Sequence, residues 1–168
     1  MKHERDLIQL FRGLIDSDQM FGIAQSINFG SDTGTKADVE YLSNNDEYLI
    51  IEAKSHKSRN APNTRNQLFG QLLTEHGKSS PLRDLHRDKI ALGILIPGDF
   101  LEGVEEIPQT PGDLYYRDGF KRIPLEMFSA FGVLVQAKYV FVASKTKVEI
   151  YSWSGFYRSE CPIHLVCA

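Results

Sequence analysis

The chain has 168 residues, 42% of them hydrophobic and 24% charged, with a net charge of −3 and a pI near 5.9. This composition predicts one soluble globular domain over residues 1–168 and excludes a polycation. No apolar run approaches the roughly 20 residues that span a bilayer, and Lys2–Asp6 does not resemble a signal peptide. The two cysteines are too few for a disulfide framework. We therefore expect a cytoplasmic protein with no membrane partner.

The first predicted element is an amphipathic helix at the N-terminus. Its apolar stripe repeats at helical spacing and contains Leu7, Ile8, Leu10, Phe11, Leu14 and Ile15. Glu4 falls in phase with this stripe. A solvated glutamate in the first turn, favoured by the helix dipole, is the simplest interpretation of that residue.

Three strands are predicted next, over Phe21–Phe29, Lys36–Leu42 and Glu47–Lys54. Turn signals separate them, first Gly-Ser-Asp-Thr-Gly and then Asn-Asn-Asp, so we expect an antiparallel meander. On the middle strand Asp38 and Glu40 share a face. Glu40 is either a reserve metal ligand or, by the simpler interpretation, a solvated strand residue.

Charged side chains gather where the third strand ends. Strand alternation places Glu52 and Lys54 on one face, and Asp38 can meet them from the neighbouring strand. Mg²⁺ prefers oxygen ligands and is usually held by one or two carboxylates plus phosphate. We therefore expect a metal held by Asp38, Glu52 and the carbonyl of Ala53, with Lys54 orienting the attacking water or offsetting negative charge. An ordinary surface charge pair, with Asp38 in a turn, is the alternative.

The remaining predicted elements are a helix over Asn63–Gly77, a strand over Lys89–Pro97 and a C-terminal region. The apolar run of Lys89–Pro97 suits a strand buried on both faces and added in parallel through a helix. Residues 98–168 are expected to extend a core of about residues 1–97. We predict that this extension contains an irregular segment, a helix that begins within Pro124–Gly132, and two closing strands at Tyr139–Ala143 and Val148–Trp153.

This pattern resembles the PD-(D/E)xK nuclease superfamily, which includes the type II restriction endonucleases. Asp38 matches the first acid, Glu52 and Lys54 match the (D/E)xK half, and Ala37 stands where the proline of the motif is expected. The resemblance implies an α/β fold with a restriction-endonuclease-like αβββαβ core, a central mixed sheet flanked by helices. It also implies Mg²⁺-dependent hydrolysis of DNA phosphodiester bonds, with Mn²⁺ able to substitute.

The resemblance adds two further groups of candidate site residues. Some superfamily members carry a metal-associated acid on the first helix, which makes Glu4 a candidate ligand. In some subfamilies a glutamine on the helix after the Glu-x-Lys strand borders the active site, and Gln67 or Gln71 would occupy that place. Exposed helix-forming residues are the alternative for both glutamines.

A local basic stretch is the expected DNA contact. No acidic residue lies between Glu52 and Glu75, whereas basic residues and glutamines are frequent there. The candidate DNA-binding residues are His56, Lys57, Arg59, Arg65, Gln67 and Gln71, and Arg83, Arg87 and Lys89 would extend the stretch. A solvated loop is the alternative.

The expected function is therefore a metal-dependent DNA endonuclease of the restriction, repair or recombination type. Double-strand cutting would require two sites, hence a homodimer or a larger nuclease complex. A catalytically silent or partner-dependent subunit that has the nuclease fold and binds DNA or protein is the alternative. Histidines and cysteines lack the spacing of a zinc site.

Overall fold

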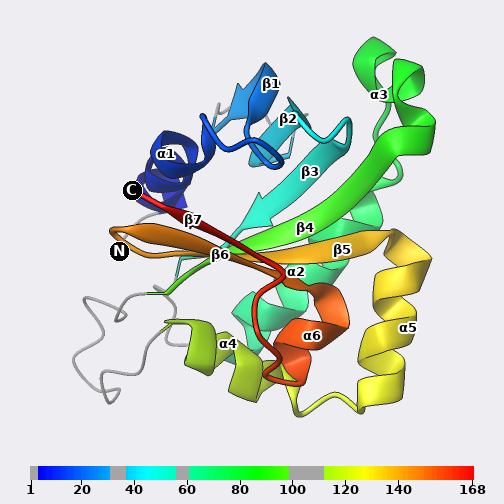
Figure 1. The fold of residues 1–168 in the computed structure, drawn as a ribbon. Helices are drawn as coiled ribbons and strands as arrows, with labels where there is room; N and C mark the ends of the chain where they lie inside the picture. The colour runs from blue at the N-terminus through cyan, green and yellow to red at the C-terminus, as the bar shows by residue number, and fades with distance from the viewer. Residues whose placement is uncertain (1–3, 31–36, 56–60, 99–111) are drawn as a thin grey trace.

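A computed structural model describes residues 4–30, 37–55, 61–98 and 112–168, and it shows an α/β protein built on one seven-stranded mixed sheet (Figure 1). The strands lie side by side in chain order, and only the β3–β4 and β4–β5 pairs are parallel. They are β1 (Ile23–Phe29), β2 (Val39–Ser43), β3 (Tyr48–Ala53), β4 (Ile90–Pro97), β5 (Ala137–Ala143), β6 (Lys147–Ser152) and β7 (His164–Cys167).

Helices connect the parallel strands, because a parallel connection must return the chain to the starting edge. The helices are α1 (Glu4–Ile15), α2 (Ala61–Glu75), α3 (Pro81–Leu85), the 3₁₀ helix η1 (Arg87–Lys89), α4 (Gly112–Phe120), α5 (Leu125–Val135) and α6 (Trp153–Tyr157). The chain thus passes through α1, β1, β2, β3, α2 and β4 in the predicted order, with α3 and η1 added before β4. The predicted α/β class, with a mixed sheet flanked by helices, is confirmed.

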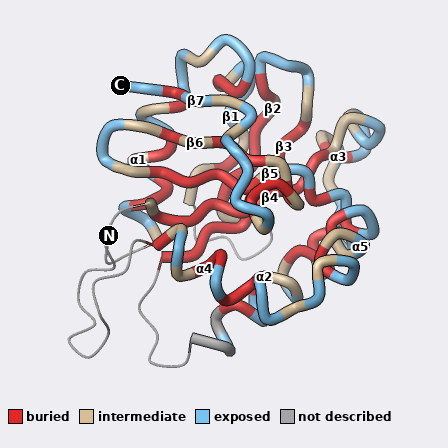
Figure 2. Tube along the Cα trace, turned by 60° about the horizontal axis from the view of Figure 1, so that its bottom comes forward, coloured by how far each residue is buried: buried red, intermediate tan, exposed pale blue. Residues whose placement is uncertain are grey.

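Strand alternation divides the core into two clusters, one on each face of the sheet. Leu49 and Ile51 of β3 pack toward α1, whereas Tyr48 and Ile50 pack toward α2, α4, α5 and α6. Both faces of β3 and β4 are therefore covered, which explains their continuous apolar sequences. Figure 2 shows buried residues along the central strands and exposed residues at turns and on the outer sides of helices.

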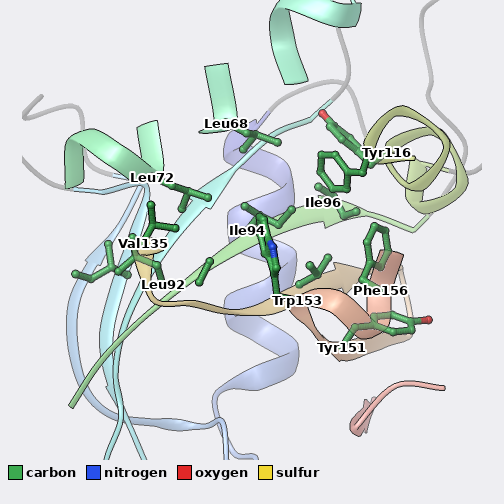
Figure 3. Packing of buried hydrophobic residues seen from close by; sticks show 14 of the residues in the cluster. Leu68, Leu72, Leu92, Ile94, Ile96, Tyr116, Val135, Tyr151, Trp153 and Phe156 are labelled. Carbon is green, nitrogen blue, oxygen red and sulfur yellow. The ribbon is translucent and has the colours of Figure 1, made fainter. Parts of the chain in front are cut away.

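The cluster under the four helices contains most of the buried aromatic rings. In Figure 3, Leu68 and Leu72 of α2 and Trp153 of α6 approach β4 at Ile94. The ring of Trp153 stacks on that of Phe128 with centroids 4.6 Å apart, and its indole N–H donates to the Phe128 carbonyl at 2.8 Å. This hydrogen bond allows a tryptophan to be buried without leaving its donor unpaired.

The sheet curls strongly around α1. Strands β1 and β7 form opposite edges of the sheet, yet His164 of β7 lies 2.9 Å from Oδ1 of Asp18, in the turn before β1. The phenol of Tyr41 donates to the carbonyl of Phe21 in the same turn at 2.7 Å. Contacts from α1 to β1, β3, β4, β5, β6 and β7 follow from this curvature.

Several element boundaries differ from the prediction. Asp38 lies directly before β2, Lys54 lies directly after β3, and Trp153 begins α6 instead of ending a strand. The short elements α3, α4, α6 and β7 were not predicted. Lys36 and residues 99–111 lie outside the described residues. In the part of the chain that the structure describes, no helix is long and apolar enough to cross a membrane.

Candidate functional site

Asp38 and Glu52 meet because they extend the antiparallel ladder of β2 and β3. Val39 pairs with Ile51 in an antiparallel ladder, so the residue before Val39, Asp38, lies opposite the residue after Ile51, Glu52. The backbone N–H of Ala53 donates to Oδ2 of Asp38 at 2.9 Å, which fixes the orientation of that carboxylate.

Glu52 is 4% exposed, and its carboxyl group shares a hydrogen bond with Asp38.

Lys54 joins this pair from the residue after β3. Its backbone N–H donates to the carbonyl of Leu95 on β4 at 2.9 Å, and the residue is 8% exposed. Its ammonium lies 3.4 Å from Oε1 of Glu4, the first residue of α1. Glu4 is therefore half-buried next to the site, whereas the simplest interpretation of the sequence expects it to be fully solvated at the start of the helix.

The site contains more negative charge than positive charge. Burial, together with hydrogen bonds to Glu75 and Asp38 and repulsion between the carboxylates, raises the pKa of Glu52 to about 10. Burial also raises the pKa of Glu4, although the ammonium of Lys54 opposes that change. Three carboxyl groups, those of Asp38, Glu52 and Glu4, thus lie near one ammonium, and Lys54 pairs that ammonium with Glu4.

Glu75, in the last turn of α2, forms the link to a second buried network. Burial disfavours its charge, but hydrogen bonds with Glu52, Lys78 and Arg83 lower its pKa. Glu52 and Glu75 therefore share one proton that resides on Glu52. Lys78 donates to Oε1 of Glu75 at 2.6 Å, and Arg83 donates to Oε2 at 2.8 Å.

Glu40 belongs to this second network, so the interpretation of Glu40 as a solvated strand residue is wrong. It is 2% exposed and accepts from Arg83 at 2.5 Å and from the phenol of Tyr48 at 2.5 Å. The error arose because strand alternation shows which face a residue occupies but not that α3 covers that face. Glu40 and Glu75 balance the charges of Arg83 and Lys78, so this network is neutral by itself.

The residues at the site suit a Mg²⁺ ion. The described side chains of Asp38, Glu52 and Glu4 offer carboxylate oxygens, and the pKa of Glu52 is raised by burial and also by the neighbouring carboxylates, whose repulsion a bound cation would relieve. Among the described residues, no three His, Cys, Asp or Glu side chains are grouped to hold a metal by themselves. Two carboxylates, completed by water and phosphate oxygens, are the usual arrangement for Mg²⁺. The carbonyl of Ala53 stays a predicted ligand.

The candidate DNA-binding residues differ in their placement. His56, Lys57 and Arg59 lie outside the described residues. Arg65 is 9% exposed, and its guanidinium lies over the ring of Tyr115, 5.7 Å from the centroid, so it packs against α4 instead of projecting from a loop. Gln67 is exposed on α2.

Gln71 differs from Gln67 because it is only partly exposed. Its Oε1 atom is buried and has no hydrogen-bond partner in the ranges that the structure describes. Gln71 precedes Glu75 by one helical turn, so both side chains project from the same side of α2. A buried acceptor on that side could receive a donor from a bound ligand or water.

The expected extension of the basic stretch is wrong for Arg83, which is buried, whereas Arg87 is exposed, Lys89 is partly exposed, and both are paired with acidic residues. Arg83 is buried between two carboxylates, Arg87 pairs with Asp84 at 2.5 Å, and Lys89 pairs with Asp46 at 2.8 Å. The charges of these three cations are already compensated by neighbouring acids. They do not form an open basic surface next to Lys54.

Sequence reasoning missed Glu75 and Arg83. One signal was present, since a glutamate in the last turn of a helix opposes the helix dipole and therefore needs a local cation. Arg83 and Glu75 also line a pocket of about 270 Å³ whose floor includes Ile50 and Leu92. This pocket lies on the side of Glu75 that faces Lys78 and α3.

The site thus consists of Asp38 and Glu52 side by side, Lys54 paired with Glu4, and the neutral network behind Glu75.

Comparison of the chain with protein-family models, with curated proteins and with solved structures finds no match.

Proposed function

We propose that this chain is a Mg²⁺-dependent endodeoxyribonuclease of the PD-(D/E)xK type, with Asp38 and Glu52 as metal ligands and Lys54 as the catalytic cation. The observation that carries the proposal is the uncompensated charge at the site. Asp38 and Glu52 lie next to the Lys54–Glu4 ion pair, while the adjacent network of Glu40, Glu75, Arg83 and Lys78 is already neutral. Once a metal has displaced the proton of Glu52, the three carboxylates carry two negative charges more than the ammonium of Lys54 offsets, which equals the charge of one divalent cation.

The topology supports the same proposal. The succession of α1, an antiparallel β1–β2–β3 meander, α2 and a parallel β4 is what a restriction-endonuclease-like αβββαβ core requires. In such a core the first acid and the Glu-x-Lys segment come from adjacent strands. Here Asp38 and Glu52 lie opposite one another one residue beyond the last pair of the β2–β3 ladder, Val39 with Ile51, which fits that arrangement.

Each residue has a role that follows from its contacts. Bound Mg²⁺ would offset charge on the phosphate oxygens and lower the pKa of a water molecule. Asp38, oriented by the Ala53 N–H, and Glu52, which contacts Glu75, would supply the two carboxylates. Lys54 is anchored through its backbone to β4, and its ammonium, which pairs with Glu4, would orient the attacking water or offset negative charge on the phosphate. Mn²⁺ is expected to replace Mg²⁺ because it accepts similar oxygen ligands.

DNA would approach from the segment that follows Lys54. The proposed contacts are His56, Lys57, Arg59, Arg65, Gln67 and Gln71. A homodimer, or a larger complex, would place two sites on the two strands of a duplex.

A second candidate is a nuclease subunit that depends on a partner for DNA recognition. The pairing of Arg83, Arg87 and Lys89 with acidic residues favours it, because non-specific DNA affinity comes largely from cations available to phosphates. The net charge of −3 is consistent with it. Cleavage that appears only in a co-purified complex would distinguish this candidate from a free-standing enzyme.

The test is cleavage of supercoiled plasmid by the wild type and by Asp38→Asn, Glu52→Gln and Lys54→Met, in Mg²⁺, Mn²⁺ or EDTA. We expect metal-dependent nicking that falls at least about 100-fold in each variant. Lys89→Met is the matched control, since this lysine pairs with Asp46 away from the site, and it should cut like the wild type. Cutting in EDTA, undiminished cutting by Lys54→Met, or no cutting of plasmid, branched or single-stranded DNA by folded wild type would contradict the proposal.

A further inference from the structure

Arg83 is the centre of a buried ionic network that joins three elements. The residue is 5% exposed, and its Nη2 donates to Oε1 of Glu40 on β2 at 2.5 Å and to Oε2 of Glu75 on α2 at 2.8 Å. Its Nε donates to Oε2 of Glu40 at 3.3 Å, and its Nη1 donates to the backbone carbonyl of Glu75 at 3.1 Å. The guanidinium therefore fixes both the side chain and the backbone of Glu75.

Glu75 carries this constraint to the candidate metal site. Both of its oxygens have a cationic partner, Lys78 on Oε1 and Arg83 on Oε2. The same carboxylate shares a hydrogen bond with Glu52. A chain of direct contacts thus runs from Arg83 through Glu75 to Glu52.

Stability alone does not explain this network. Removing charges from water costs several kcal/mol per ion, and buried ion pairs are often replaced by apolar residues with no loss of stability. The Glu40–Arg83–Glu75 group instead holds one carboxylate in a defined position against Glu52. Partners behind a ligand restrict its rotation, so less conformational freedom is lost when a metal binds.

We infer that Arg83 and Glu40 are positioning residues of the metal site, which fix Glu75 and through it the carboxylate of Glu52. This inference rests on the proposed function, because it assigns a role at the same site. A purely structural clamp between β2, α2 and α3 is the alternative. The two roles differ in the quantity that the network affects. A purely structural role affects the stability of the fold, whereas a positioning role affects the affinity of the site for metal.

The experiment uses the double variant Glu40→Gln/Arg83→Met. It removes one negative and one positive charge, so the net charge around Glu52 is unchanged and the general attraction for cations is preserved. Mn²⁺ binding is followed by electron paramagnetic resonance of the free ion. We expect Mn²⁺ affinity to fall about tenfold or more, which is the usual effect of removing a partner behind a metal ligand. The metal concentration for half-maximal plasmid nicking should rise by the same factor.

The matched control is Asp84→Asn/Arg87→Gln, which removes another ion pair of the same segment, but an exposed one. It should bind Mn²⁺ like the wild type. Equal Mn²⁺ affinity of the folded Glu40→Gln/Arg83→Met protein and the wild type would overturn the inference and leave the proposed function intact. Wild type that binds no Mn²⁺ would overturn the proposed function and the inference together.

A second variant covers the case in which the double variant does not fold. Arg83→Lys keeps the positive charge, but an ammonium lacks the planar fork that spans both carboxylates. We expect a folded protein whose Mn²⁺ affinity is reduced several-fold. An affinity equal to that of the wild type would overturn the inference.

Discussion

The chemistry of this protein is concentrated in one buried carboxyl group. Glu52 is 4% exposed, and its carboxyl group shares hydrogen bonds with Glu75 and Asp38. Its pKa of about 10 means that the metal-free protein keeps this group protonated near neutral pH. A divalent cation would displace that proton, so metal binding and proton release are coupled.

The raised pKa gives a prediction for stability without metal. Glu52 binds its proton up to about pH 10 in the folded chain, whereas an unfolded chain releases it near 4.5. Between these values the folded state binds more protons, so stability falls as pH rises, by at most about 1.4 kcal/mol per pH unit.

The measurement is the free energy of unfolding in EDTA from pH 5 to pH 9, for the wild type and for Glu52→Gln. We expect the wild type to lose stability across this range and the variant, which has no proton to release, to lose less. Saturating Mg²⁺ should reduce the slope of the wild type. Parallel curves for the two proteins would show that Glu52 is ionised in the folded state.

At the scale of elements, close packing of α5 on α6 fixes the helical side of the core. Gly132 of α5 faces the indole of Trp153, and a Cβ at this position would lie 2.3 Å from Cδ1 of the ring. The ring cannot move aside easily, because it is stacked on Phe128 and hydrogen-bonded to the Phe128 carbonyl. A side chain at Gly132 must therefore separate the two helices.

We predict that Gly132→Ala lowers the free energy of unfolding by about 1–3 kcal/mol, the usual cost of overpacking a core. Gly70→Ala is the matched control, since Gly70 lies in α2 with nothing within 4 Å of a new Cβ, and this change should stabilise the protein by about 0.5–1 kcal/mol. Urea denaturation measures both. Stability of Gly132→Ala equal to the wild type would refute the packing described for α5 and α6.

The sequence predicted the elements whose patterns are long and local. The stripe of α1, the alternation of β3 and the apolar run of β4 each match an observed element. The meeting of Asp38 and Glu52 could also be predicted, because both belong to one hairpin with a short turn. Elements such as α6 and β7 are too short to show a period, and they form because the rest of the core provides a surface for them.

The part of the site that was missed depends on tertiary packing. Glu75 and Arg83 reach Glu40 and Glu52 only because α2 and α3 cover one face of β2 and β3. No local pattern specifies that contact, so the sequence alone predicts an exposed cation at Arg83, which is buried in the structure. The same limit made Glu40 look like a solvated residue.

At the scale of the molecule, the two clusters form one cooperative unit because they share the strands of a single sheet. The cluster under the helices includes Leu92 and Ile94 of β4 but also Tyr116, Phe128 and Trp153, which all follow residue 98. Strands β5, β6 and β7 complete the surface that covers α1. A chain that ends at residue 98 would leave β4 as an exposed, strongly apolar edge.

We therefore predict that residues 1–98 do not fold alone. Circular dichroism of this fragment should show no cooperative thermal transition, whereas the full chain should unfold in one transition that coincides with the change in Trp153 fluorescence. A fragment with a native-like spectrum and a cooperative transition would show that the first half is an independent unit.

The most direct test of the metal site is an anomalous difference map from crystals soaked in Mn²⁺. We predict a peak between the carboxylates of Asp38 and Glu52, within about 2.0–2.6 Å of an oxygen of each, the range of hard cations bound to oxygen. The peak should be absent from crystals of Glu52→Gln soaked in the same way. A Mn²⁺ ion bound elsewhere, with no peak at Asp38 and Glu52, would contradict the proposal that these two carboxylates hold the catalytic metal.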